Sequence, residues 1–158
     1  MADAFAAFLT NRHLLTAIVA LILAQVLKTF FNYWRTGSWQ KALALLFSTG
    51  GMPSSHSALG TSLAMSIGLH EGFDSTLFAV SAVLALVVMH DAQGIRRAAG
   101  QQAIAINFLF SKLENQGIKL DTKLKELLGH RPVEVMAGAI LGLIVTTIAF
   151  TLFPTGQA

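Results

Sequence analysis

Long apolar runs separated by short polar segments make up most of the chain. Four of these runs have the length and composition of membrane-crossing helices, namely Leu14–Phe31, Ser54–Leu69, Ser75–Met89 and Val133–Phe153. An α-helix rises about 1.5 Å per residue, so about 20 mainly apolar residues cross a hydrocarbon core about 30 Å thick. The pattern therefore predicts transmembrane helices at these four places.

Shorter segments lie between and after the predicted spans. Residues Trp39–Phe47 are apolar but too short to cross, which favours an interfacial or re-entrant helix. Residues 92–102 are polar, and whether 98–113 crosses as a fifth helix stays open. A charged stretch follows, in which 121–128 is expected to be helical. We therefore expect one all-α domain over residues 1–158, an integral membrane helical bundle of four to five transmembrane helices plus short interfacial or re-entrant helices.

Composition supports a membrane protein. Hydrophobic side chains make up 54% of the 158 residues and charged side chains only 12%, whereas soluble domains carry about 25% charged residues. A compact soluble domain of this length could not bury so much apolar surface. The chain has no cysteine, which excludes disulfides, thiolate metal sites and a cysteine nucleophile.

The basic residues indicate an orientation in the membrane. The side reached after the first span holds Lys28, Arg35, Lys41, Arg96, Arg97 and, if 98–113 does not cross, Lys112, Lys119, Lys123, Lys125 and Arg131. Lysine and arginine accumulate in cytoplasmic loops. We expect an integral protein of a bacterial inner membrane or an organellar membrane, with this side in the cytoplasm. The net charge is only +3 and the basic residues form no single run, so no nucleic-acid partner is expected.

Residues 50–57, Gly-Gly-Met-Pro-Ser-Ser-His-Ser, are the most unusual stretch of the chain. A glycine-rich turn that enters a helix offers backbone N–H groups and the positive end of the helix dipole to an anion. Ser54, Ser55 and His56 add hydroxyl and imidazole donors. The alternative is a helix cap with an incidental histidine.

A second candidate lies just before the last span. Pro132 suits the first turn of a helix, which places His130 at the cap and Glu134 four residues further on the same face. A carboxylate beside an imidazole fixes its tautomer and strengthens the other ring nitrogen as a nucleophile or base. The alternative is a capping interaction between Glu134 and the helix start.

Several weaker candidates accompany these two segments. Lys28 and Arg35, separated by six residues, suit either a phosphate site or a membrane interface. Arg96 and Arg97 could bind phosphate, pair with Asp91 or contact anionic lipid. A metal site is conceivable from His56, His90, Asp91 and His130, but no close-spaced ligand pair supports it. His13 and His70 are interpreted as interfacial residues.

Together these segments resemble the divergent branch of the type 2 phosphatidic acid phosphatase and vanadium haloperoxidase superfamily. Pro53-Ser54-Ser55-His56 resembles its Pro-Ser-Gly-His motif, and the Lys28 and Arg35 spacing resembles its first motif, with Thr36 in place of proline. The third motif is similar to His130, Glu134 and the Ala137-Gly138 pair. Leu124 stands where that motif has an arginine, and Arg96, Arg97 or Arg131 are the candidates to supply the cation.

The resemblance implies a metal-independent phosphoric monoester hydrolase that acts through a phosphohistidine and needs no cofactor. His130 would be the nucleophile, Glu134 its orienting carboxylate and His56 the general acid. The phosphate ligands would be Lys28, Arg35, Ser54, Ser55 and the Gly51-Met52 backbone. Preorganised cations and N–H groups of this kind stabilise charge on phosphoryl oxygens.

The expected substrate is a lipid phosphate in the bilayer, with phosphatidic acid, phosphatidylglycerophosphate and polyprenyl phosphate as candidates. The alternative is a non-catalytic protein that binds or transports anionic lipids with the same pocket, and a homo-oligomer is left open. Vanadate, a mimic of the phosphoryl-transfer transition state, separates the two functions.

Overall fold

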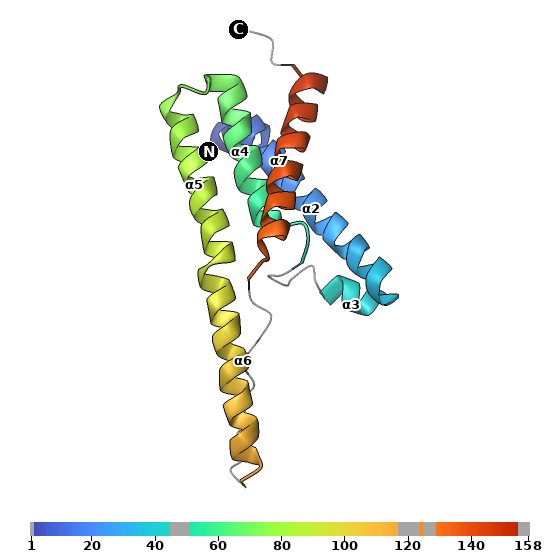
Figure 1. Ribbon diagram of the computed structural model, residues 1–158. Coiled ribbons are helices and arrows are strands. Elements are labelled where there is room, and N and C mark those ends of the chain that lie inside the picture. Colours follow the sequence, from blue (N-terminus) through green and yellow to red (C-terminus); the bar gives the residue numbers. More distant parts are fainter. Residues whose placement is uncertain (1, 45–50, 117–123, 125–128, 155–158) are drawn as a thin grey trace.

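The computed structural model describes residues 2–44, 51–116, 124 and 129–154, and these residues form helices and short connections without a strand. The helices are α1 (Ala2–Thr10), α2 (Arg12–Thr36), α3 (Trp39–Ala44), α4 (Ser55–Glu71), α5 (Thr76–Gln93), α6 (Ile95–Glu114) and α7 (Pro132–Leu152). Figure 1 shows α2, α4, α5 and α7 side by side in a bundle, with α6 extending beyond it. The expected all-α membrane bundle is confirmed.

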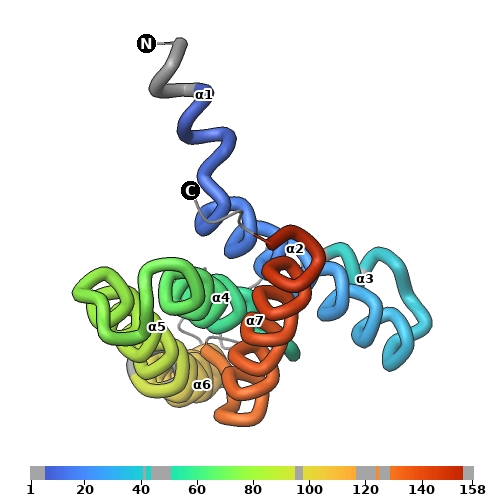
Figure 2. The backbone as a smooth tube through the Cα atoms, turned by 90° about the horizontal axis from the view of Figure 1, so that it is seen from above, coloured from blue at the N-terminus to red at the C-terminus, as the bar shows by residue number. Residues whose placement is uncertain are grey.

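Among the residues that the structure describes, three helical segments are long and apolar enough to cross a membrane: α2, the combined α5–α6 segment and α7. Large apolar side chains such as Val80, Leu86 and Ile140 are more than half exposed on their outer surfaces, as expected for helices that face lipid. The fourth bundle helix, α4, has 17 residues, or about 26 Å. Viewed from above, it occupies the centre, in contact with α2, α5 and α7 (Figure 2).

Small side chains allow the helices around α4 to pack closely. Ala20 and Ala24 of α2 and Ala58 of α4 form a buried cluster, against which Leu141 and Val145 of α7 pack. Small residues at helix interfaces let backbones approach within a bilayer, where the hydrophobic effect gives little drive for association. Small residues of α2 and α4 therefore lie at the centre of the bundle.

Polar capping residues fix where the bundle helices begin. The Asn11 side chain accepts a hydrogen bond from the Leu14 N–H at 3.0 Å at the start of α2. Ser75 accepts one from the Phe78 N–H at 3.2 Å at the start of α5. Pro132 occupies the first turn of α7, where its missing N–H costs nothing. These capping residues and the proline therefore mark the starts of the helices in the sequence.

The structure shows what the polar stretch after the third predicted span forms. The polar residues 92–102 do not form a loop, because α5 continues to Gln93 and α6 begins at Ile95. This stretch is rich in alanine, glutamine and arginine, which have high helix propensities. Helix α6 continues in the direction of α5 past the bundle (Figure 1), so 98–113 does not turn back as a separate crossing.

Two other expectations concern short segments. Helix α3 matches the first part of the interfacial helix expected over 39–47, whose remainder falls outside the described residues. The helix expected over 121–128 also lies outside them, apart from Leu124. That residue returns alongside α6, because its N–H donates to the side-chain oxygen of Asn107 at 2.9 Å and its carbonyl accepts from the side-chain amide at 2.8 Å.

Candidate active site at one end of the bundle

Three helix ends converge on a pocket at one end of the bundle. The start of α4, the end of α5 and the segment that leads into α7 enclose about 280 Å³. The pocket is lined by His56, Val87, Val88, Asp91, Ala92 and His130. Two histidines and one carboxylate thus share a pocket with apolar walls, although their sequence positions span 74 residues (130 minus 56).

His130 is held in this pocket through both its backbone and its ring. Its N–H donates to the carbonyl of Ala92 at 3.0 Å, which ties the segment before α7 to the end of α5. The ring Nδ1 lies 3.0 Å from Oε2 of Glu134, and the imidazole is almost fully buried. The predicted contact between His130 and Glu134 is confirmed. With Nδ1 engaged, Nε2 is the remaining ring nitrogen for chemistry.

Glu134 also fixes the start of α7. Its Oε2 accepts a hydrogen bond from the Arg131 N–H at 3.2 Å, so the capping interaction considered as an alternative exists beside the histidine contact. The backbone carbonyl of Glu134 accepts from the Ser54 N–H at 2.9 Å. One residue therefore connects the imidazole, the helix start and α4.

Lys28 is a buried charged residue of α2. The side chain is only 2% exposed although it comes from the membrane-crossing α2, and the negative charge of Glu134 acts on its ammonium. Intramembrane ionisable groups are costly and are retained mostly where they pair or line a functional cavity. Lys28 interacts electrostatically with Glu134 and is not among the residues that line the pocket.

The serines predicted to bind phosphate are buried at the start of α4. Ser54 is the N-cap, and its Oγ accepts from the Ser57 hydroxyl at 3.0 Å and from the Ser57 N–H at 3.4 Å. Ser55 is 3% exposed. Ahead of them Gly51 has φ +98°, a conformation that side chains rarely adopt, and Met52 is exposed. The segment before α4 is therefore shaped by the Ser54 cap and by the glycine turn at Gly51.

Of the three arginines predicted to bind phosphate, the structure describes the side chain of Arg35 alone. Arg35 is exposed in the last turn of α2 and does not line the pocket. The backbones of Arg96 and Arg97 lie in the first turn of α6, but their side chains fall outside the described ones. Their roles stay predictions.

Asp91 is a pocket residue that the sequence analysis did not include in the site. In the sequence, Asp91 stands out because the polar pair His90-Asp91 follows an apolar run directly. From the sequence, Asp91 is interpreted as an arginine partner or a metal ligand. Val87 lies one helical turn before Asp91 and lines the same pocket. The shared helical face of Val87 and Asp91 is the sequence signal for this wall of the pocket.

The fold and the site together define an integral membrane helical bundle with a buried histidine–carboxylate pair at one end. The sequence profile described as the Divergent PAP2 family matches residues 9–145. The chain belongs to this family, as the sequence resemblance predicted. It is 43% identical to the uncharacterized membrane protein YuiD of Bacillus subtilis (strain 168), in a match covering 92% of this chain and 98% of that protein. No solved structure matches the chain significantly.

Proposed function

We propose that the protein is a membrane lipid-phosphate phosphatase that hydrolyses a phosphomonoester headgroup through a phosphohistidine. The observation that carries this proposal is the 3.0 Å contact between His130 Nδ1 and Glu134 Oε2 in a pocket shared with His56. A carboxylate on Nδ1 raises the electron density at Nε2, which makes it a competent nucleophile. The family membership supports the same chemistry.

The proposed reaction has two steps. In the first, Nε2 of His130 attacks phosphorus while the bond from phosphorus to the lipid oxygen breaks, and protonated His56 gives its proton to that oxygen. In the second, His56 takes a proton from water, whose oxygen attacks phosphorus as the phosphorus–nitrogen bond breaks. Inorganic phosphate leaves, and His130 and His56 return to their starting states. Each histidine therefore has one role per step.

The charges around the pocket fit this division of roles. The carboxylate of Asp91 lines the pocket with His56, and a carboxylate beside a catalytic histidine orients the imidazole for proton transfer. Glu134 stabilises positive charge on His130 while the new bond forms. Lys28, Arg35, Arg96 and Arg97 are the proposed sources of positive charge for the phosphoryl oxygens.

The position of the pocket at a bundle end suits a lipid substrate. A headgroup phosphate can enter there while acyl or prenyl chains stay beside the apolar outer faces of the helices. We propose that this end faces the cytoplasm of a bacterial or organellar membrane, which favours a phosphatidylglycerophosphate-like lipid over an exported polyprenyl carrier.

Phosphate release tests the proposed activity. Purified protein in detergent micelles is given phosphatidic acid, phosphatidylglycerophosphate or a polyprenyl phosphate, and free phosphate is measured. We expect release from at least one lipid, inhibition by vanadate, complete loss in His130→Ala and a loss of roughly 10²–10⁴-fold in His56→Ala.

His90→Ala is the matched control, because His90 is exposed near the same helix end but does not line the pocket. It should retain the parent rate. Full activity in His130→Ala would overturn the mechanism. Lipid binding without turnover in the parent, kept in His130→Ala, would instead support the binding or transport function.

A further inference from the structure

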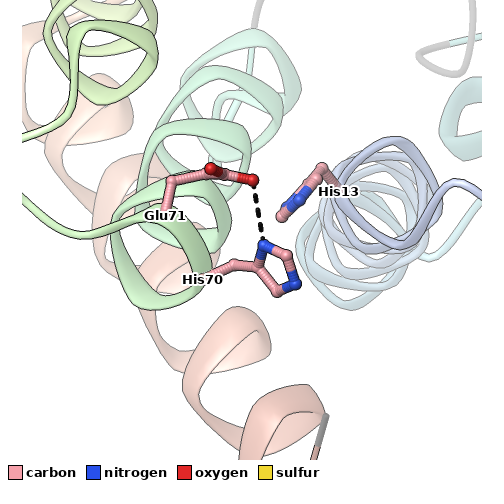
Figure 3. A group of neighbouring side chains, drawn as sticks. All are labelled: His13, His70 and Glu71. Carbon is pink, nitrogen blue, oxygen red and sulfur yellow. Dashed lines mark hydrogen bonds and ion pairs between the residues drawn. The ribbon is translucent and has the colours of Figure 1, made fainter. Parts of the chain in front are cut away.

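A second cluster of polar side chains lies at the opposite end of the bundle from the candidate active site. His13 comes from the first turn of α2, and His70 and Glu71 come from the last turn of α4 (Figure 3). One ligand atom from each of the three lies within 4.8 Å of the other two. Nothing in the proposed phosphatase chemistry uses these residues.

Antiparallel packing of α2 and α4 creates this cluster. The start of α2 and the end of α4 meet at one face of the bundle, and the two imidazole rings lie 5.1 Å apart between centroids. Nδ1 of His70 lies 3.1 Å from Oε1 of Glu71. The two histidines, interpreted from the sequence as interfacial residues, are 57 positions apart (70 minus 13) and meet only through this packing.

The His13 ring is oriented by a neighbour in α4. Its Nδ1 lies 2.7 Å from the hydroxyl of Ser66, which is fully buried. Metal-binding histidines almost always use one ring nitrogen for such a hydrogen bond, because it fixes the tautomer and aims the other nitrogen. Nε2 of His13 is therefore the nitrogen placed for a ligand.

Charges of both signs act at this cluster: the carboxylate of Glu71 favours a cation, and the charge of Arg12 opposes one. His70 and Glu71 are about two-fifths exposed, which leaves the cluster accessible from water, and they lie where the carbonyls of α4 carry the negative end of its dipole. The adjacent Arg12 is directed toward α7, since its guanidinium donates to the Ala149 carbonyl at 3.3 Å and lies over the Phe150 ring at 3.8 Å.

We propose that His13, His70 and Glu71 bind one Zn²⁺ ion that links the start of α2 to the end of α4. Two imidazoles and a carboxylate are a common zinc ligand set, and three protein ligands leave a fourth position for water. Zn–N and Zn–O distances of about 2.0–2.2 Å require the ligand atoms to approach within roughly 3–4 Å of one another. Rotation of the exposed His70 and Glu71 side chains brings the ligand atoms to this separation.

Zinc binding to the full chain tests the proposal. The protein is purified in detergent with an affinity tag that contains no histidine, and Zn²⁺ is titrated against a chromogenic chelator. We expect one ion per chain, a rise in the thermal unfolding midpoint because the ion binds the folded state, and visible absorption of a tetrahedral site when Co²⁺ replaces Zn²⁺. Ser66→Ala should weaken binding roughly 10–100-fold.

The paired variants locate the ion. His13→Gln/His70→Gln should lose the bound ion, whereas His56→Gln, at the other end of the bundle, should keep it. Failure of the parent to bind at micromolar Zn²⁺, or full binding in the double variant, would overturn the proposal. If the double variant does not fold, the exposed Glu71→Gln decides, and unchanged affinity there contradicts the site. Phosphate release is measured in parallel, so loss of either function is recognised separately.

Discussion

At the scale of single residues, Glu134 couples the candidate chemistry to the fold. Its carboxylate contacts His130 and the Arg131 N–H, and its charge acts on Lys28. Lys28 is buried, so its ammonium depends on that nearby charge for compensation. A change at Glu134 should therefore affect stability as well as the orientation of the imidazole.

A double-mutant cycle separates these two effects. Glu134→Gln keeps the side-chain size but removes the negative charge that acts on the buried Lys28, which should lower the thermal unfolding midpoint. Lys28→Met combined with Glu134→Gln should recover much of that loss, because no uncompensated charge remains. Thermal unfolding in detergent measures the loss in the single variant and the recovery in the double variant. Additive effects of the two substitutions would show that the charges do not interact.

At the scale of elements, the contact between α4 and α7 holds the site together. The hydroxyls of Ser62 and Thr146 are hydrogen-bonded at 2.8 Å across this interface, and the Thr61 hydroxyl donates to the Ala139 carbonyl at 3.2 Å. Gly138 lies directly against the Ser54 carbonyl, where a Cβ atom would overlap that oxygen. The close approach lets the Ser54 N–H reach Glu134.

Gly138→Ala should push α4 and α7 apart and lower both stability and phosphate release. The added methyl would meet backbone atoms, which cannot rotate away as a side chain can, and overpacking of this kind costs typically about 1–3 kcal/mol. Thermal unfolding and phosphate release measure the outcome. Ile140→Phe, a change on the exposed face of the same helix, is the control and should have little effect. Unchanged thermal stability and unchanged phosphate release in Gly138→Ala would contradict the role of this contact.

Local signals in the sequence predict some of these elements well. Pro132 marks the start of α7, and the spacing from His130 to Glu134 predicts their contact because helical residues four apart share a face. The continuity of α5 and α6 could not be predicted from polarity, since a polar stretch such as 92–102 suits an exposed helix as well as a loop. The pairing of His13 with His70 depends on how α2 and α4 pack, which no local pattern encodes.

At the scale of the whole molecule, the two polar clusters lie at opposite ends of the bundle. The pocket with His56 and His130 is at the start of α4, and the cluster with His70 is at its end. Helix α6 extends from the end that holds the pocket (Figure 1). If that end faces the cytoplasm, as the distribution of lysine and arginine predicts, α6 must lie there as well.

Site-directed labelling tests this orientation on a chain that has no native cysteine. Asp74→Cys lies in the exposed turn between α4 and α5, and Lys112→Cys lies near the exposed end of α6. A membrane-impermeant maleimide should label Asp74→Cys in intact cells and Lys112→Cys only after permeabilisation. The reverse pattern would place the pocket on the outer side. Equal labelling from one side would contradict the crossing of α5.

The most direct test of the proposed chemistry is a trapped phosphohistidine. The protein is mixed with a lipid carrying radiolabelled phosphate and quenched with alkali, in which phosphohistidine survives, and the labelled peptide is identified by mass spectrometry. The mechanism predicts label on the imidazole of His130, and none on the His130→Ala protein. Rapid phosphate release by the parent, with label on another residue or label that persists in His130→Ala, would contradict it.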